Sequence, residues 1–218
     1  MFEQQENFEK LRQRMVTQQI EGRGIHDEGI LRAMRLVPRE VFVTDAYQIY
    51  AYDDTPLPIP NKQTISQPYV VALMLRALHL SPSDSVLEIG TGSGYAAALL
   101  GQIAQQVHSV ERHKKLVVYA RQRLEKLGYD NVFVHQGDGT LGWPENAPYN
   151  AIVVAAGGPV VPAPLKQQLL IGGRLVMPVG DSERRQHLIC LTRDSQSEFR
   201  RTDLGAVAFV PLIGEEGW

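Results

Sequence analysis

The first third of the chain alternates between helix-like apolar spacing and a segment that lacks any period. Apolar residues recur three and four positions apart, at Phe8, Leu11, Met15, Ile30, Leu31 and Met34. This spacing predicts helices over residues 8–21 and 27–37, separated by Gly22-Arg23-Gly24. Residues 50–68 show no such period and contain Pro56, Pro58, Pro60 and Pro68. We therefore expect an irregular, extended segment there, and long loops inside a compact domain are often functional.

From Ser85 onward, short apolar runs alternate with segments of helical period. Helices are expected over residues 95–105, 113–127 and 165–170, the last ended by Gly172-Gly173. Strands are expected over residues 85–90, 107–111, 131–135, 151–155, 174–179, 188–192 and 206–210. Strands that alternate with helices favour a parallel sheet covered on both faces. The predicted fold is α/β, a doubly wound and mainly parallel sheet of about seven strands with helices on both faces and an N-terminal helical extension.

Length and composition favour a soluble globular protein and exclude several other classes. The chain has 218 residues, 44% of them hydrophobic and 21% charged, with a net charge of −2, so no general nucleic-acid surface is expected. The one cysteine, Cys190, lies in an apolar run and is expected to be a buried hydrophobe. The N-terminus lacks the apolar core of a signal peptide, and no apolar run reaches membrane-spanning length. We expect a cytoplasmic monomer without a membrane or nucleic-acid partner.

A glycine turn, Gly90-Thr-Gly-Ser-Gly94, joins the first of these strands to the following helix. Glycines at this place let a ligand meet the backbone at the carboxyl edge of a sheet. Glu111 ends the next strand, 21 residues after Gly90, where a carboxylate can accept both hydroxyls of a ribose. A dinucleotide fingerprint would read G-x-G-x-x-G, whereas this turn reads G-x-G-x-G after Glu88. With Asp138 placed after the third strand to accept from an adenine amino group, the pattern fits S-adenosylmethionine better than a nicotinamide dinucleotide.

The stretch Asn61-Lys-Gln-Thr-Ile-Ser-Gln-Pro-Tyr69 turns from polar to apolar after Pro68. Two interpretations of its hydroxyls remain open at this point. Ser66 has a side chain that favours the N-cap of a helix, and proline is tolerated in the first helical turn. The same hydroxyls, Thr64 and Ser66, and the free N–H groups of a helix start could instead hold a substrate anion.

Several motifs resemble those of the protein-L-isoaspartate (D-aspartate) O-methyltransferases, a family of class I, Rossmann-like, S-adenosylmethionine-dependent methyltransferases. The general methyltransferase motifs are Leu87-Glu-Ile-Gly-Thr-Gly-Ser-Gly-Tyr95, Gly137-Asp-Gly139, Gly172-Gly-Arg-Leu-Val176 and Pro178-Val-Gly180. The motifs particular to the family are Val37-Pro-Arg39, Ala51-Tyr52, Pro58-Ile59, Gln63-Thr-Ile-Ser-Gln-Pro68 and Phe209-Val-Pro-Leu212. The resemblance runs from about residue 15 to the C-terminus and is most specific at Gln63–Pro68.

The resemblance implies methyl esterification of the free α-carboxylate of L-isoaspartyl residues in damaged proteins and peptides. The ester turns a poor leaving group into methoxide, so the next amide nitrogen can close a succinimide whose hydrolysis returns some normal aspartate. The expected products are that ester and S-adenosylhomocysteine. A carboxylate with a pKa near 4 is already ionised at neutral pH, so the transfer needs no general base. This agrees with the lack of a Ser/His/Asp triad or a metal-ligand spacing in the sequence, and no metal is expected.

The resemblance also implies roles for individual residues. Ser66 is expected to be the active-site residue, and Glu88 to orient the methionyl end of the cofactor. The expected substrate-binding residues are Thr64, Ile65, Ser66, Val210, Pro211 and Leu212, the last three through backbone groups. The expected cofactor-binding residues are Glu88, Gly90, Thr91, Gly92, Gly94, Glu111, Arg112, Gly137, Asp138 and Gly139. All belong to one expected domain, residues 1–218, with N-terminal helices and a substrate loop (1–80), a cofactor-binding core (81–180) and C-terminal strands (181–218).

Three positions depart from the family pattern, and three other functions compete with it. The departures are Pro60-Asn61, where a glycine-containing turn is usual, Ala155, where threonine is common, and Gly157-Gly158.

A nicotinamide-dependent oxidoreductase is disfavoured by the glycine spacing. An RNA or DNA methyltransferase is disfavoured because Ala155-Ala-Gly-Gly158 replaces the acidic or amide residue with prolines that amino-group methylation uses. A non-catalytic binding module would leave Gln63–Pro68 without a purpose.

Overall fold

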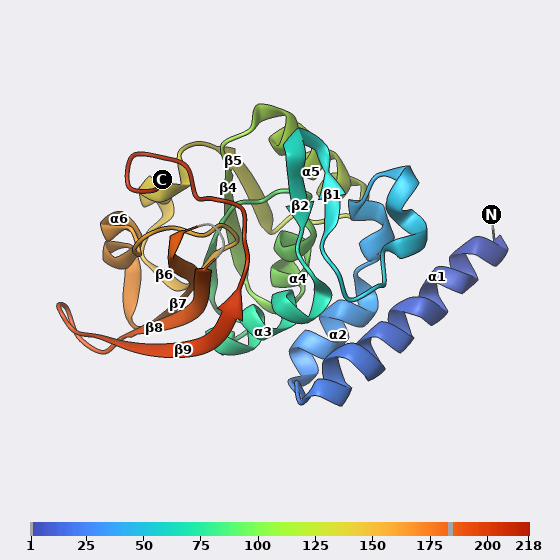
Figure 1. Cartoon of the computed structure of the whole chain (residues 1–218), viewed down its shortest axis with the longest axis horizontal. Helices are drawn as coiled ribbons and strands as arrows, with labels where there is room; N and C mark the ends of the chain where they lie inside the picture. The colour runs from blue at the N-terminus through green and yellow to red at the C-terminus, as the bar shows by residue number, and fades with distance from the viewer. Residues whose placement is uncertain (1, 183–184) are drawn as a thin grey trace.

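The computed structural model describes residues 2–182 and 185–218, and Figure 1 shows one central sheet flanked by helices. The predicted seven-stranded sheet is confirmed within these residues. In spatial order its strands are β5 (Val132–Gln136), β4 (Gln106–Glu111), β3 (Ser85–Ile89), β6 (Tyr149–Val154), β7 (Leu169–Ser182), β8 (Arg185–Arg193) and β9 (Phe199–Val207). The pairs from β5 to β7 are parallel, and β8 and β9 are added antiparallel at one edge.

Helices cover both faces of this sheet, as the alternation of apolar runs predicts. The four helices of the α/β part are α3 (Pro68–Leu78), α4 (Tyr95–Ile103), α5 (Lys114–Lys126) and α6 (Ala163–Gln167). The buried residues of α3, α4 and α5 join one apolar cluster, whereas Leu165 of α6 joins a second. Along β3, Val86 belongs to the first cluster and Leu87 to the second, so successive side chains face opposite layers. Parallel strands buried on both faces place their carboxyl ends at one common edge, where ligands bind.

The N-terminal extension is helical, but its first helix is shorter at the C-terminal end than its apolar spacing predicts. Helix α1 (Phe2–Met15) is followed by a π-helical turn (Val16–Ile20) and a 3-10 turn (Glu21–Arg23), so the expected helix over residues 8–21 ends early. Gly24, with φ of 86°, ends this segment in a left-handed conformation that favours glycine. Helix α2 (Glu28–Leu36) begins where predicted because the Asp27 side chain accepts a hydrogen bond from the Ile30 N–H.

Residues 50–68 are more regular than their prolines suggest. They contain an antiparallel pair, β1 (Leu57–Ile59) and β2 (Gln63–Ile65), which Figure 1 shows standing above α4 and beside α5. The turn that joins them, Pro60–Lys62, places Asn61 at φ 61°, a left-handed conformation that asparagine tolerates better than most residues. Asn61 can therefore stand where the family resemblance leads us to expect a glycine-containing turn. The expectation of a wholly irregular segment was wrong, because three-residue strands are too short to show a period.

Two expectations for the C-terminal third also require correction. Helix α6 ends at Gln167 and Leu169 already pairs with Tyr149, so the helix expected to reach Leu170 is partly strand. Gly172, at φ 84°, lies in a register shift within β7 and does not end a helix. The last strand is Phe199–Val207 rather than residues 206–210, because most of its side chains are exposed and give no apolar pattern. No helix in the described part of the chain is long and apolar enough to span a membrane.

Candidate active site

The glycine turn lies between β3 and α4 at the carboxyl edge of the sheet. Gly90, Gly92 and Gly94 all have positive φ, at 90°, 55° and 92°, a region in which other side chains are strained. Gly94 ends the turn by packing against Ala120 of α5, where an added Cβ would lie 3.2 Å from the Ala120 Cβ. The turn therefore needs glycine for its own path, and it leaves the backbone of residues 90–92 open to a ligand.

Glu111 is fixed beside this turn by two backbone donors. Its Oε2 accepts a hydrogen bond from the Gly92 N–H at 3.0 Å, and its Oε1 accepts from the His113 N–H at 2.9 Å. A carboxylate has about four lone-pair sites, so each oxygen keeps room for a second donor. Both oxygens are thus oriented and can still accept the two hydroxyls of a ribose.

Glu88 lies on β3 directly opposite Ser109 of β4, and its side chain is completely buried. Its Oε2 accepts from the Ser109 hydroxyl, which lies 2.5 Å from the Thr91 hydroxyl, and its Oε1 has no hydrogen-bond partner in the described residues. Burial raises the pKa of Glu88 to about 8, the charge of Glu111 adds to this rise, and the Ser109 hydrogen bond opposes it. An unpartnered buried oxygen beside the glycine turn is suited to a cationic ligand group.

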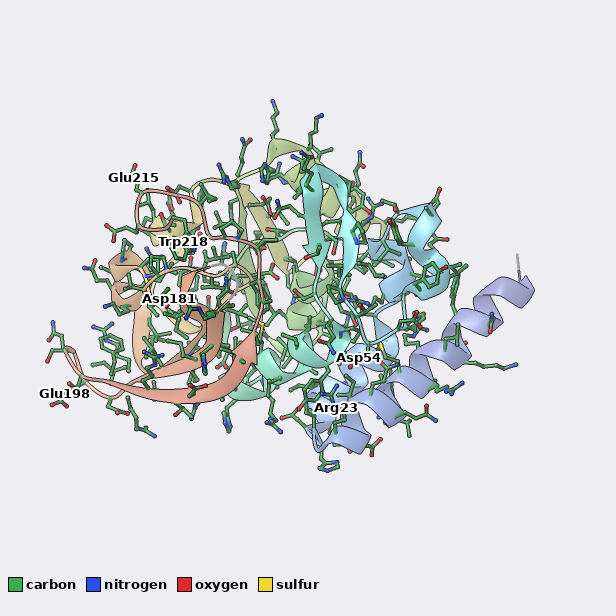
Figure 2. The ribbon with its side chains drawn as sticks, in the orientation of Figure 1. Arg23, Asp54, Asp181, Glu198, Glu215 and Trp218 are labelled. Atoms are coloured by element: carbon green, nitrogen blue, oxygen red, sulfur yellow. The ribbon has the colours of Figure 1, made fainter. Side chains whose placement is uncertain are left out.

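Ser66 follows β2 and precedes helix α3, and the structure excludes one of the two interpretations of its hydroxyl. The first free N–H of α3, that of Tyr69, is capped by Asp54 Oδ1 at 3.1 Å, and Asp54 Oδ2 accepts from Gln67 Nε2 at 2.7 Å. Asp54 also pairs with Arg23 at 2.7 Å, and Figure 2 shows these two side chains together beside the N-terminal helices. Helix capping by Ser66 is therefore wrong. Its Oγ has no hydrogen-bond partner among the described residues, and Ser66 lines a pocket.

The segment after β9 returns to the same edge of the sheet and forms a further wall. The Val210 carbonyl accepts from the Gly157 N–H at 2.8 Å, and the Leu212 N–H donates to the Gly157 carbonyl at 2.7 Å. Gln186 of β8 holds the preceding residue, Phe209, by both backbone groups, at 2.8 and 3.1 Å. These bonds fix Val210 to Leu212 as an extended segment facing the β1–β2 loop.

Most of the residues expected from the sequence line one pocket. The substrate-side residues there are Thr64, Ile65, Ser66, Val210, Pro211 and Leu212, and the cofactor-side residues are Glu88, Gly90, Thr91, Gly92, Glu111, Arg112 and Gly139. Gly94, Gly137 and Asp138 do not line it. Residues that we did not predict as site residues complete the lining, among them Gln63, Tyr95, Val110, His113, Ala156 and Ile213. Gln63 and Tyr95 lie within the motifs that carry the resemblance, Ala156 lies in the Ala155–Gly158 stretch, and Ile213 directly follows the Phe209–Leu212 motif.

Asp138 lies beneath the C-terminal turn, close to the pocket. Its Oδ1 accepts from the Thr140 N–H and hydroxyl, at 2.9 and 2.7 Å, and its Oδ2 accepts from the Glu215 N–H at 2.9 Å. Burial tends to raise the pKa of Asp138, but these hydrogen bonds and the nearby Arg112 charge outweigh it and lower the pKa. The group is an ionised acceptor with remaining lone pairs. No group of three or more metal-ligating side chains is found in residues 2–182 and 185–218.

A family model described as protein-L-isoaspartate(D-aspartate) O-methyltransferase matches residues 9–217, nearly the whole chain. The chain belongs to this family. Curated relatives named protein-L-isoaspartate O-methyltransferase include one from Pelobacter propionicus, 59% identical over 97% of this chain and 94% of its own length. Another, from Brucella anthropi, is 55% identical over 97% of both chains.

Solved structures agree with this membership. One named protein-L-isoaspartate O-methyltransferase is 31% identical and superposes with a TM-score of 0.86, covering 94% of this chain and 67% of its own. A Plasmodium falciparum structure, described as a putative family member in complex with S-adenosyl-L-homocysteine, has a TM-score of 0.79 at 24% identity. It covers 93% of this chain and 98% of its own, and at this identity it supports the fold alone. The methyltransferase fold and family expected from the sequence are confirmed.

Proposed function

We propose that this protein transfers a methyl group from S-adenosylmethionine to the free α-carboxylate of L-isoaspartyl residues, which starts their repair through a succinimide. Family membership supports this activity. The observation that carries it is the pocket in which the glycine turn and Glu111 face the Thr64–Ser66 loop. A cofactor held at the first set of residues would present its methyl group to a carboxylate held at the second.

The cofactor side fits S-adenosylmethionine group by group. We assign the ribose hydroxyls to Glu111 and the methionyl end to the Gly90–Gly92 backbone, Thr91 and Glu88, whose unpartnered buried oxygen suits an ammonium group. We assign the adenine to Asp138 with Gly137 and Gly139, and we place Arg112 at its edge. Gly94 contributes to cofactor binding indirectly, because it lets the glycine turn follow its path. When bound, this ligand supplies an electrophilic methyl group on a sulfonium.

The substrate side needs only to position a nucleophile that the substrate brings. In our proposal Ser66 Oγ donates a hydrogen bond to the isoaspartyl carboxylate, beside Thr64 and Ile65. The backbone of Val210, Pro211 and Leu212 holds the peptide, which suits substrates of varied sequence. An ionised carboxylate needs no base, so the contribution of these residues is orientation at near-attack distance. Opposite charges disappear during the transfer, so the apolar walls given by Ile65, Val110 and Leu212 favour the reaction.

We further propose that residues 1–218 act as one unit, because the pocket takes residues from the N-terminal, central and C-terminal parts. The sequence supports a monomer that works in the cytoplasm on damaged proteins and peptides rather than on nucleic acid. The net charge of −2 is the basis for expecting no nucleic-acid partner. Size-exclusion chromatography with light scattering tests the monomer, and gel-shift assays test nucleic-acid binding.

One assay tests the proposed function. The protein is incubated with S-adenosylmethionine carrying a labelled methyl group and with an isoaspartyl peptide or its normal aspartyl twin. We expect labelling of the isoaspartyl peptide alone, and release of the label as methanol within hours at mildly alkaline pH, because a methyl ester is base-labile. Label that survives this treatment, or that reaches both peptides equally, would contradict carboxyl methylation of isoaspartate. Transfer to RNA or DNA instead would support the nucleic-acid alternative.

A further inference from the structure

Arg39 is a fully buried guanidinium directly behind the substrate loop. It opens the 3-10 turn Arg39–Phe42, and none of its side chain is exposed. Its Nε donates to the Ala51 carbonyl at 2.8 Å and its Nη2 donates to the Ser66 carbonyl at 2.9 Å. The guanidinium carbon lies 4.9 Å from the ring centre of Tyr95, which itself lines the pocket. One side chain thus joins the N-terminal part, the loop and the glycine-turn helix.

The charge on Arg39 is not explained by stability. No carboxylate of the described residues forms an ion pair with it, and its Nη1 has no hydrogen-bond partner there. The charge of Asp54 acts on Arg39 without a direct ion pair, and Asp54 is itself paired with Arg23 at 2.7 Å. Burying a cation without a direct ion pair is costly, and well-packed apolar residues often stabilise such a position as well or better. A buried cation with unused hydrogen-bonding capacity, bonded to the backbone of the pocket-lining residue Ser66, indicates a role in binding an anion.

We propose that Arg39 is a positioning residue for the isoaspartyl carboxylate, acting through Ser66. Its hydrogen bond fixes the Ser66 carbonyl, and hence the backbone torsions that point Oγ into the pocket. Its positive charge favours the anionic substrate carboxylate and loses that preference once the carboxylate has become a neutral ester. Arg39 therefore discriminates substrate from product without touching either. This inference rests on the proposed function.

The test compares Arg39→Gln and Arg39→Lys with the wild-type enzyme. We measure kcat and KM for an isoaspartyl peptide, S-adenosylmethionine affinity by calorimetry, and the melting temperature. We expect Arg39→Gln to lower kcat/KM by roughly 10- to 100-fold, the range for a lost hydrogen bond to a charged group, with cofactor affinity changed by less than about threefold. Arg39→Lys keeps the charge and should recover part of the loss.

Arg193→Gln is the matched control. Arg193 also donates to backbone carbonyls, among them those of Leu169 and Gln196, and lies 5.7 Å from the Phe199 ring centre, but unlike Ser66 and Tyr95 these residues do not line the pocket. Its loss should lower the melting temperature and leave kcat/KM unchanged. Equal kcat/KM for Arg39→Gln and wild type, both measured well below their melting temperatures, would overturn the proposal. If Arg39→Gln does not fold, Arg39→Met is measured in its place, and an unchanged kcat/KM there would overturn the proposal, because methionine carries neither the charge nor the hydrogen bonds.

A double-mutant cycle with Ser66→Ala tests whether Arg39 acts through Ser66. With the hydroxyl already absent, Arg39→Gln should lower kcat/KM by less than it does when Ser66 is present, because only the effect of its charge on the carboxylate remains, whereas full additivity would overturn the proposal. Hydrogen exchange of residues 63–67 gives a readout that does not depend on activity, and we expect faster exchange in Arg39→Gln. If the wild-type protein fails to methylate isoaspartyl peptide, the proposed function fails. The exchange measurement then still decides whether Arg39 orders this loop.

Discussion

The Glu88→Gln substitution removes a buried carboxyl group while keeping its shape. In the folded protein Glu88 is fully buried, and its pKa is raised to about 8, first by burial and then by the charge of Glu111. In the unfolded chain the same group titrates near 4.5. Between these two values the folded state therefore holds a proton that the unfolded state has released. The stability of the wild-type protein should fall as pH rises across this window, because stability rises with pH only where the unfolded state binds more protons.

The magnitude follows from the two pKa values. One pKa unit corresponds to 1.36 kcal/mol, so a rise from 4.5 to about 8 corresponds to roughly 3–5 kcal/mol lost by pH 8. Glutamine cannot ionise and escapes this loss. The stability difference between Glu88→Gln and wild type should be constant below pH 4.5 and should then shift in favour of the variant as pH rises to 8.

Urea unfolding of the ligand-free protein at pH 5, 6.5 and 8 measures this difference. Glu125→Gln, at an exposed position of α5, removes the same charge from the surface and controls for changes in net charge. We expect the Glu125→Gln difference to stay flat while the Glu88→Gln difference grows by several kcal/mol. A Glu88→Gln difference that does not vary with pH would show that Glu88 is ionised in the folded protein, and would refute the reasoning.

Three further predictions concern the two sides of the pocket and the cap of helix α3. Ser66→Ala and Ser66→Gly should each lower kcat/KM for an isoaspartyl peptide by about 10- to 150-fold, from a lost hydrogen bond of roughly 1.5–3 kcal/mol, with little change in melting temperature. Wild-type turnover in Ser66→Gly would exclude that contact. Asp54→Ala should reduce the free energy of unfolding by roughly 1–2 kcal/mol in urea, because it removes the cap of α3; unchanged stability would contradict the cap. Glu111→Ala should weaken S-adenosylmethionine binding by roughly 1.5–3 kcal/mol in calorimetry, and an unaltered affinity would remove Glu111 from the site.

The parts of this molecule that could be predicted are those whose signal is local. Gly90, Gly92 and Gly94 adopt positive φ between a strand and a helix, and the glycines that this turn requires lie close together in the sequence. Glu111 could be placed because the next parallel strand ends at the same edge of the sheet. The helix expected at residues 165–170 extends too far, because a short apolar run such as Leu169–Ile171 fits a strand and a helix equally well. Strand β9 was misplaced because an exposed edge strand has no apolar alternation to read.

The contacts that could not be predicted join residues far apart in the chain. Asp54 caps a helix that begins fourteen residues later, whereas from the sequence capping was one of two interpretations of the adjacent Ser66. Asp138 accepts from Glu215, 77 residues away, so its place beneath the C-terminal turn had no local signal. Arg39 reads as part of a family motif, yet its bond to Ser66 spans 27 residues. Local sequence thus indicates which groups are present, and the tertiary fold decides which of them remain available to a ligand.

The C-terminal turn ends in a tryptophan that is tied to the pocket wall. Trp218 is 41% exposed, and its indole N–H donates to the Gly157 carbonyl at 2.9 Å, the same oxygen that receives the N–H of Leu212. Figure 2 shows it near Glu215, whose N–H donates to Asp138. The other tryptophan of the chain, Trp143, stacks on His135 at 4.1 Å between ring centres. The unlabelled protein therefore carries a fluorophore bonded to the same carbonyl as Leu212 of the pocket lining, and we expect its emission to change when the pocket is occupied, without a dye or a coupled assay.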